Sequence, residues 1–304
     1  EGQQRGDEHG IEIDDYNVSR IEVLNGPASL TYGSDALAGV VNIVPMASLP
    51  EGKIKGNVDA NYQGNNGMMA YHADIAGNNN GISWGAFVTQ KQAHDYKNKY
   101  DNYVFNSRFN NTNYGANIGI NKQWGYSHLS FTSFNQHLGL VEGDRDSNGD
   151  FVKLVNNNGE EDEVPVTGSD NKSYSMTVPK QQINHQKIVW DNSLYLHNGG
   201  RLGLTLGYQL NQRREFGDVL EPNTPELYLH LQTFNYALKY YFPEMKGWQT
   251  TAGINGMQQT NENKGEEFLI PGYDLFDFGA FAVTSKTGNK LTLSGGRRFD
   301  RLNR

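Results

Sequence analysis

The sequence contains no cysteine, which excludes a disulfide scaffold, a thiolate metal site and a cysteine nucleophile. It also has no apolar run of the roughly 18 residues that a membrane-spanning helix needs, and its mean hydropathy is −0.69. Together these absences exclude a helical membrane protein. They leave a membrane β-barrel open, because the strands of such a barrel alternate apolar and polar residues and so average to a hydrophilic composition.

Basic charge is scarce as well. The chain has 26 Lys and Arg against 34 Asp and Glu, which gives a formal net charge of −8. Nucleic acid is therefore not the expected partner, since phosphate binding requires a clustered positive face. The first residues, EGQQRGDEHG, lack the basic stretch and apolar run of a signal peptide, as expected of either a mature or a truncated chain.

The residues in excess are those typical of strands and turns. Aromatic residues make up 12% of the 304 residues, with 17 Tyr and 14 Phe, and 35 Gly stand beside many Asn. From residue 52 onward, segments of alternating apolar and polar residues are separated by turns rich in Gly and Asn. About eleven strands are predicted in this way. They cover residues 53–63, 68–77, 82–93, 113–123, 126–137, 183–197, 201–212, 227–242, 248–260, 273–286 and 290–301.

The connections favour a membrane barrel over a soluble β-sandwich, which is the alternative for alternating strands. Tight turns interleave with long polar loops, as in a barrel with short turns on one side of the membrane and long loops on the other. Aromatic residues lie near many strand ends, where they would form a girdle. Residues 227–231 alternate with the opposite parity to residues 234–242, so a bulge or register change is predicted near Thr233.

Residues 21–44, IEVLNGPASLTYGSDALAGVVNIV, differ from the alternating segments. A short strand is predicted at 21–24, a turn at 25–27, a helical turn at 28–30 and a second strand at 40–44. Glycines at 26, 33 and 39 allow close packing of the backbone. One interpretation is a small packing motif without a function. A phosphate loop is excluded, because neither GxxxxGK[ST] nor GxGxxG occurs in this stretch.

This segment resembles the C-terminal part of the plug domain of TonB-dependent outer-membrane receptors. The usual form there is Ile-Glu-Val-Leu, then Arg-Gly-Pro, then Tyr-Gly-x-x-Ala-x-Gly-Gly-Val-Ile-Asn-Ile. The sequence departs from it at Asn25, where the family commonly has arginine, and at Ala38, where it has glycine. The matching positions, which would carry plug architecture, are Ile21, Glu22, Val23, Leu24, Gly26, Pro27, Tyr32, Gly33, Ala36, Gly39, Val40, Asn42 and Ile43.

The resemblance implies an all-β membrane barrel of about 22 antiparallel strands, filled by a small α+β plug. Residues 1–50 are then expected to be the C-terminal part of the plug domain, and residues 51–304 the N-terminal half of the transmembrane barrel. The chain is expected to be a piece of a longer receptor, without the TonB box and without the terminal aromatic strand. Two open sheet edges would make an isolated fold unfavourable.

The resemblance also implies the function. Such receptors lie in the outer membrane of Gram-negative bacteria, in contact with lipid, and import a scarce ligand with force from the TonB complex. A ferric siderophore is the predicted ligand, with haem or zinc uptake as the alternative. A passive porin or surface-binding barrel, or a barrel enzyme, would be a rival. No Ser/His/Asp or paired-carboxylate arrangement can be placed at catalytic spacing, so the protein is not expected to be an enzyme or to require a cofactor.

The segment DEHGIEID before the plug motif is the first candidate ligand site. Asp7, Glu8, His9, Glu12 and Asp14 bring carboxylate oxygens and an imidazole close together in the sequence. Related plugs carry this segment on loops that face the outer vestibule. Contact with a metal ion, haem or a ferric chelate is therefore predicted, and a solvated acidic loop is the alternative.

The segment DRDSNGD in the longest connection is a candidate calcium loop. Its oxygen donors at alternate positions are Asp144, Asp146, Asn148 and Asp150. Gly149 would make the bend, but the glutamate expected at the twelfth position is replaced by Val155. A plain external loop is the alternative.

Arginines near the strand ends assigned to the outer side are a further candidate group. They would either attract an anionic chelate in the vestibule or pair with acidic loops. These arginines are Arg213, Arg214, Arg297, Arg298 and Arg301.

Overall fold

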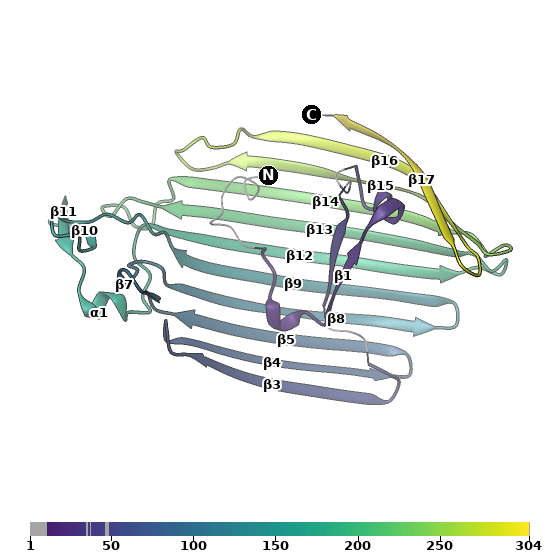
Figure 1. Ribbon diagram of the computed structural model, residues 1–304, viewed down its shortest axis with the longest axis horizontal. Coiled ribbons are helices and arrows are strands. Elements are labelled where there is room, and N and C mark those ends of the chain that lie inside the picture. Colours follow the sequence, from purple (N-terminus) through teal and green to yellow (C-terminus); the bar gives the residue numbers. More distant parts are fainter. Residues whose placement is uncertain (1–10, 35, 37, 46–48, 304) are drawn as a thin grey trace.

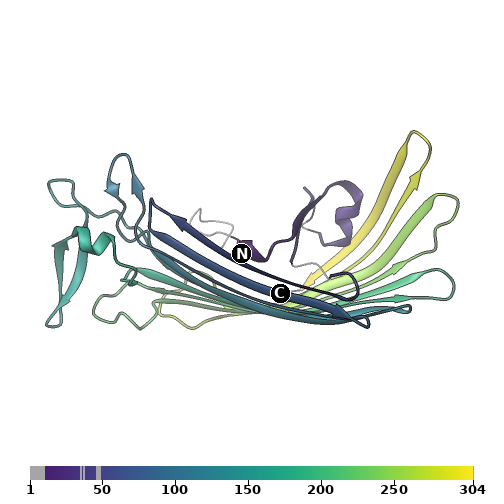
Figure 2. The ribbon, with the colours of Figure 1, turned by 90° about the horizontal axis from the view of Figure 1, so that it is seen from below.

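A computed structural model describes residues 11–34, 36, 38–45 and 49–303. Its main element is an antiparallel sheet of 11 strands in the order β17-β16-β15-β14-β13-β12-β9-β8-β5-β4-β3. The sheet curves into an open trough, and a small N-terminal unit lies on its concave side (Figure 1, Figure 2). The predicted all-β fold of about eleven antiparallel strands is confirmed. Among the described residues, no helix is long and apolar enough to cross a membrane.

The strands of the large sheet lie within a few residues of the predicted segments. They are β3 (Lys53–Gln63), β4 (Met68–Asn79), β5 (Ile82–Ala93), β8 (Phe109–Lys122), β9 (Gly125–Gly139), β12 (Lys180–Tyr195), β13 (Arg201–Phe216), β14 (Leu227–Tyr241), β15 (Trp248–Asn263), β16 (Tyr273–Thr287) and β17 (Thr292–Asn303). Short turns join the strands at one end of the trough, here called the turn end. All long connections lie at the opposite end, the loop end.

The register gives the two faces of the sheet different characters. One row of paired residues points to the convex face and is apolar, namely Ile118, Leu129, Trp190, Leu206 and Tyr236. The next row points to the concave face and is mostly polar, namely His128, Asp191, Thr205, Ala237 and Asn255. An apolar outer face and a polar inner face are typical of barrel strands in a membrane.

The bulge predicted near Thr233 is wrong. The pairing of β14 with β15 runs without a break from Leu229 to Tyr241. The leucines in residues 227–231 point to the concave face near the loop end, whereas Phe234 and the residues that alternate with it point to the convex face. The alternation of apolar residues changes parity along β14 because the apolar residues move from the concave to the convex face. The pairing register with β15 is unaltered.

The N-terminal unit contains a two-stranded sheet formed by β1 (Arg20–Leu24) and β2 (Val40–Val44). Between them lies the 3-10 helix η3 (Gly26–Thr31), with Pro27 in its first turn, where a missing N–H is tolerated. Gly39 has a φ of +124°, and a Cβ there would lie 2.8 Å from the carbonyl oxygen of Leu24. Only glycine fits this close approach without strain.

The remaining plug-motif residues act within this unit. The amide of Asn42 donates to the carboxylate of Glu22 across the two strands at 2.9 Å. The backbone N–H of Ala36 donates to the carbonyl of Gly33 at 3.4 Å, which closes the turn after η3. These contacts are consistent with a structural role for the motif.

Small elements cover the loop end. They are the hairpins β6 (Lys97–Asn98) with β7 (Asn102–Tyr103) and β10 (Val152–Asn157) with β11 (Glu160–Pro165), and the short helix α1 (Gly168–Asn171). The sequence predicted only connections in these stretches. An ion pair between Asp95 and Arg108, with side chains 0% and 1% exposed, lies beneath them.

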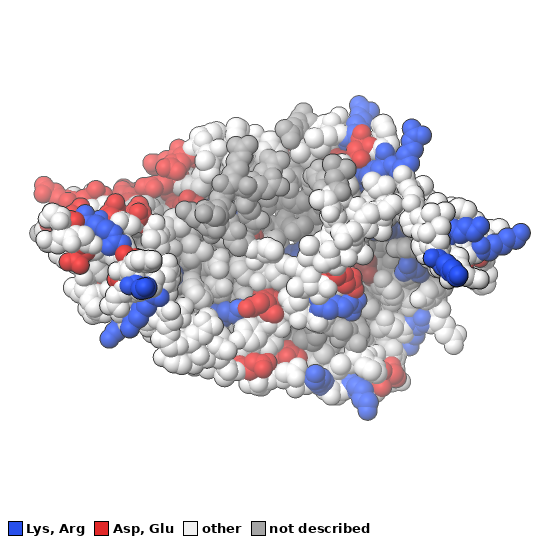
Figure 3. Space-filling model, viewed as in Figure 1, with Lys and Arg blue, Asp and Glu red and all other residues white. Residues whose placement is uncertain are grey.

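Acidic side chains gather at the loop end. In the connections at residues 140–179, 217–226 and 264–272, Asp and Glu outnumber Lys and Arg. The space-filling view shows acidic groups at the left end over β10 and β11, and basic groups at the turn end on the right (Figure 3). The pKa of Glu226 is raised by burial and by the neighbouring carboxylates of Glu267 and Asp218. The loop end therefore carries a negative field.

Candidate functional site

Residues 11–19, here called the N-terminal segment, cross the concave face of the large sheet. The segment includes the short 3-10 helix η2 (Asp15–Asn17). The concave face of the large sheet is here called the wall. The acidic side chains of the segment contact it in two separate places. Glu12 contacts β12 and β13, whereas Asp14 and Asp15 contact β5. The segment is therefore attached to the wall by side chains rather than by strand pairing.

The carboxylate of Glu12 is the centre of the first attachment. It lies 2.9 Å from Nδ1 of His185 and 3.5 Å from Nη2 of Arg213, and it accepts a hydrogen bond from Asn211. Burial alone would raise the pKa of Glu12, but the hydrogen bond and charge of His185, with the charge of Arg213, outweigh it and lower the pKa. Glu12 is thus a buried carboxylate that its partners keep charged.

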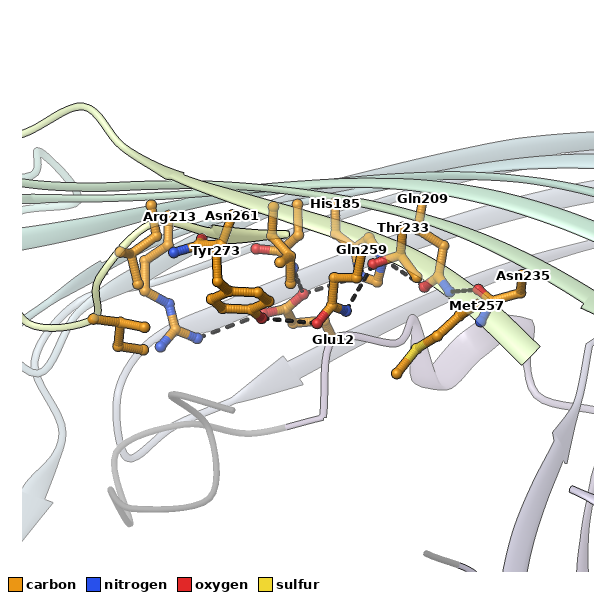
Figure 4. A pocket seen from close by; sticks show the side chains of 14 residues that line it. Glu12, His185, Gln209, Arg213, Thr233, Asn235, Met257, Gln259, Asn261 and Tyr273 are labelled. Carbon is orange, nitrogen blue, oxygen red and sulfur yellow. Dashed lines mark hydrogen bonds and ion pairs between the residues drawn. The ribbon is translucent and has the colours of Figure 1, made fainter. Parts of the chain in front are cut away.

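A cavity of about 310 Å³ opens beside Glu12 at the loop end (Figure 4). Amide, hydroxyl and charged groups share its lining with apolar side chains, a mixture suited to holding an apolar body while orienting a few polar atoms. The lining residues are Glu12, His185, Gln209, Asn211, Arg213, Leu229, Leu231, Thr233, Asn235, Met257, Gln259, Asn261, Ile270 and Tyr273.

The second attachment is centred on Asp14. Its carboxylate accepts a hydrogen bond from the hydroxyl of Thr89 at 2.5 Å, and Nδ1 of His72 lies 2.7 Å from the same hydroxyl. The other ring nitrogen of His72 is 3.3 Å from Asp74. Tyr16 stacks on the His72 ring with centroids 5.3 Å apart. The residues of β4 and β5 that point to the concave face therefore bind the N-terminal segment through a chain of polar contacts.

A second hollow of about 510 Å³ lies beside this attachment. Lys91 projects into it and pairs with Asp15. The other lining residues are Tyr16, Asn61, Gln63, Met68, Phe109, Asn111 and Gln136. The N-terminal segment thus lines both hollows, one beside Glu12 and the other beside Asp15.

A third attachment holds η3. Two of its carbonyl oxygens accept hydrogen bonds from Arg298 on β17 and Asn255 on β15, each at 3.0 Å. The ammonium of Lys239 on β14 lies 4.6 Å from the centre of the Tyr32 ring. The plug motif therefore fixes the N-terminal unit against three strands of the sheet.

The residues predicted to bind a ligand from the sequence divide into two groups. Asp7, Glu8 and His9 lie outside the described residues. Glu12 and Asp14 both face the wall, but they meet different strands, so the structure does not bring them to a common point. Ligand contact by this set stays a prediction.

The candidate calcium loop is shaped by Asp146. Its Oδ1 accepts backbone N–H groups of Asn148 at 2.8 Å and Asp150 at 3.0 Å, while Arg145 donates to the carbonyl of Gly149 at 2.8 Å. In the described part of the chain, no group of three or more His, Asp or Glu side chains is arranged to hold a metal ion. Calcium binding by Asp144 and its neighbours stays a prediction.

Sequence reasoning did not identify the polar wall that receives the N-terminal segment. The available signal was the alternation of residues along each strand, which assigns every second residue to the concave face. Polar residues at such positions near a long loop are candidates for contact with a plug. Of the arginines singled out, Arg213 pairs with Glu12, and Arg298 pairs with Asp300 at 2.5 Å. Neither partner is in an acidic loop of the barrel, since Glu12 belongs to the N-terminal segment and Asp300 lies on β17 with Arg298.

Acid is expected to release the N-terminal segment. Because the folded-state pKa of Glu12 lies below the ordinary 4.5, its contribution to attachment is complete above that value and is lost as pH falls through the lowered pKa. A nitroxide at Ile11→Cys, which introduces a cysteine into a chain without one, should become more mobile as the pH falls below 4.5. In a Glu12→Gln background the label should already be mobile at neutral pH. Equal pH responses with and without Glu12 would contradict this assignment.

Comparison with known families supports the interpretation of the N-terminal unit. A model of the TonB-dependent receptor plug domain matches residues 2–40. No curated protein matches the chain.

Solved structures of an iron transporter and of siderophore receptors share the fold over most of the chain. The FrpB iron transporter of Neisseria meningitidis (F5-1 variant) has a TM-score of 0.72 at 14% identity, covering 95% of this chain and 48% of that one. The siderophore receptor PirA of Pseudomonas aeruginosa has a TM-score of 0.66 at 12% identity, covering 98% and 46%. A mutant of the ferric enterobactin receptor PfeA of Pseudomonas aeruginosa, solved with enterobactin, has a TM-score of 0.69 at 12% identity, covering 94% and 45%.

At these identities the similarity shows the fold alone, and the chain spans about half the length of the structures it matches. The plug model matches residues 2–40, and the fold of the chain is similar to that of these receptors and this transporter.

Proposed function

We propose that the protein is a TonB-dependent receptor of the Gram-negative outer membrane that imports a ferric siderophore. The observation that carries this proposal is the cavity between Glu12 and the wall at the loop end. A ligand that arrives from that end meets the plug and the wall together. Its binding therefore has a direct means of altering how the plug is held, because it interacts differently with the attached and detached states.

We further propose that residues 1–50 end a plug domain and residues 51–304 form the first half of the barrel. The outermost strands β3 and β17 each have one edge without a partner in the large sheet. Ile21, Val23 and Val41 on the small sheet are 61%, 64% and 62% exposed. Both features suit a chain whose remaining surface is covered by further strands and further plug.

The three attachments define what must break for a ligand to pass. Contacts through Glu12, through Asp14 and through η3 hold the N-terminal unit against the concave face. Each is a small set of polar contacts, so a pull on the plug by the TonB complex would open them one after another. The TonB complex is the proposed partner for this step.

Two structural neighbours support a ferric chelate as the ligand, since one is described as a siderophore receptor and another contains enterobactin. Haem or zinc is the second candidate, motivated by His9 among carboxylates. A passive porin is disfavoured because the N-terminal unit occupies the concave side of the sheet.

Uptake of radioactive iron from ferric siderophores by whole cells tests the proposal. Deleting the receptor should reduce uptake to background, and deleting TonB should have the same effect in cells that still carry the receptor. Normal uptake of iron chelates, haem and zinc without the receptor would reject all these ligands. A large, steady conductance of the purified receptor in a planar bilayer would instead support a porin.

A further inference from the structure

We propose that Glu12 occupies an oxyanion site that also serves the ligand, so that a carboxylate on the incoming ferric chelate and the N-terminal segment compete for Arg213. This inference rests on the proposed uptake of a ferric chelate. It adds a chemical class, a chelate with a carboxylate, and a residue through which the plug senses occupancy of the cavity.

The wall already shows that it binds a carboxylate. His185 on β12 and Asn211 on β13 are register partners, and Arg213 lies two residues further along the same face. All three converge on the carboxylate of Glu12, whose side chain is 5% exposed. Charge-assisted hydrogen bonds in a site shielded from water are about twice as strong as neutral ones.

The contact between Glu12 and Arg213 is longer than a typical charge-assisted hydrogen bond. The contact between Nη2 of Arg213 and Oε1 of Glu12 measures 3.5 Å, whereas a charge-assisted bond is typically about 2.7–2.9 Å long. Glu12 belongs to a segment that is also fixed at Asp14. A carboxylate on a free ligand has no such tether, so it would form the closer two-bonded contact that a guanidinium favours.

The cavity gives a ligand access to this site. Arg213 and Glu12 both line it, together with the amides of Gln259 and Asn261 and the apolar side chain of Met257 (Figure 4). A ligand in the cavity would reach Arg213 once the side chain of Glu12 moved away, with no change in the strands. Displaced Glu12 would then lose its contacts with the wall, and the first attachment would open.

The acidic loop end does not prevent this exchange. Most of its charges are exposed to water, where salt screens them over about 8–10 Å. The guanidinium of Arg213, by contrast, belongs to a residue that is only 6% exposed.

The test is equilibrium binding of two iron chelates to the full-length receptor. Ferric citrate presents carboxylates, whereas ferric desferrioxamine B presents hydroxamates and no free carboxylate. Glu12→Ala removes the internal competitor and should tighten ferric citrate binding about tenfold, while Arg213→Gln should weaken it about tenfold. Neither change should alter the affinity for ferric desferrioxamine B by more than about twofold.

Lys91→Met is the matched control. It removes the ion pair with Asp15 and so loosens the same segment without touching the Arg213 site. Its ferric citrate affinity should stay near the parent value. A gain equal to that of Glu12→Ala would show that general loosening of the plug is responsible, and would overturn the inference.

Two further outcomes are decisive. Unchanged ferric citrate affinity in Glu12→Ala, or no ferric citrate binding by either protein, overturns the oxyanion site even if cells import iron through the receptor. Failure of the proposed function is a different result, namely cells whose uptake of iron, haem and zinc does not depend on the receptor. The expected exchange would also mobilise the label at Ile11→Cys on addition of ferric citrate.

Discussion

Replacing Arg108 with alanine is expected to open the loop end of the sheet, at a local cost of about 3–5 kcal/mol. Arg108 binds both oxygens of Asp95, through Nε at 3.0 Å and Nη2 at 2.6 Å, in a pair almost without exposure. It also donates to the carbonyl oxygens of Ser175 at 3.0 Å and Asp170 at 2.9 Å. One side chain therefore joins the connection between β5 and β8 to the segment around α1.

The cost is large because the change leaves a buried charge without its partner. Burial raises the pKa of Asp95, even though the hydrogen bonds and charge of Arg108 act in the opposite direction. Without Arg108 the carboxylate must take up a proton, draw in water or leave the interior. Replacing both residues by leucine should recover only part of the loss, since two carbonyl oxygens still lack a donor.

Hydrogen exchange of the full-length receptor checks this expectation. Amides of residues 95–108 and 168–177 should lose protection in the variant, while strands β12 to β15 keep theirs. Arg145→Ala is the control, because Arg145 pairs with Asp101 at 2.7 Å with side chains 36% and 25% exposed. Its cost should be no more than about 1 kcal/mol. Similar protection in both variants would mean that the Asp95 pair does not organise the loop end.

The Arg108 cluster also shows why the loop end was not predicted from the sequence. The strands of the large sheet follow from alternation, because one face is apolar along its length and the other is polar. The hairpin of β10 and β11 has no such pattern, since its second strand begins with four consecutive acidic residues. Its position depends on side chains such as Lys153, which meets Asp170 on α1 at 2.5 Å. Contacts of this kind have no local signature.

The same limit applies to the candidate site. The plug motif at residues 21–44 was found because its residues are close together in the sequence and have a distinctive order. Glu12 and Asn211, by contrast, are 199 positions apart, and the sequence around either residue does not predict contact with the other. Parity predicts that His185 and Asn211 face the same side of the sheet. It does not predict which plug residue reaches them.

Ile188→Lys is the second large change, and it tests the proposed membrane location. Ile188 lies near the middle of β12, is 45% exposed, and pairs on the convex face with Phe131 and Tyr208. Between residues 182 and 194 the convex positions of β12 carry no charge, whereas the concave positions include Lys187 and Asp191. A lysine facing the lipid midplane is expected to lower the free energy of unfolding by roughly 2–4 kcal/mol.

The neighbouring change Val189→Lys separates lipid contact from the general effect of a lysine in the strand. Val189 faces the concave side opposite Gly207, where the nearest atoms to an added Cβ are 3.8 Å away, so a longer side chain has room. Its cost should stay below about 1 kcal/mol, because the ammonium reaches a polar interior. Urea unfolding of the full-length receptor in phospholipid vesicles measures the loss in free energy of unfolding for Ile188→Lys and for Val189→Lys. Equal losses would show that the convex face does not meet lipid, since only a hydrocarbon environment distinguishes the two sides of one strand by this amount.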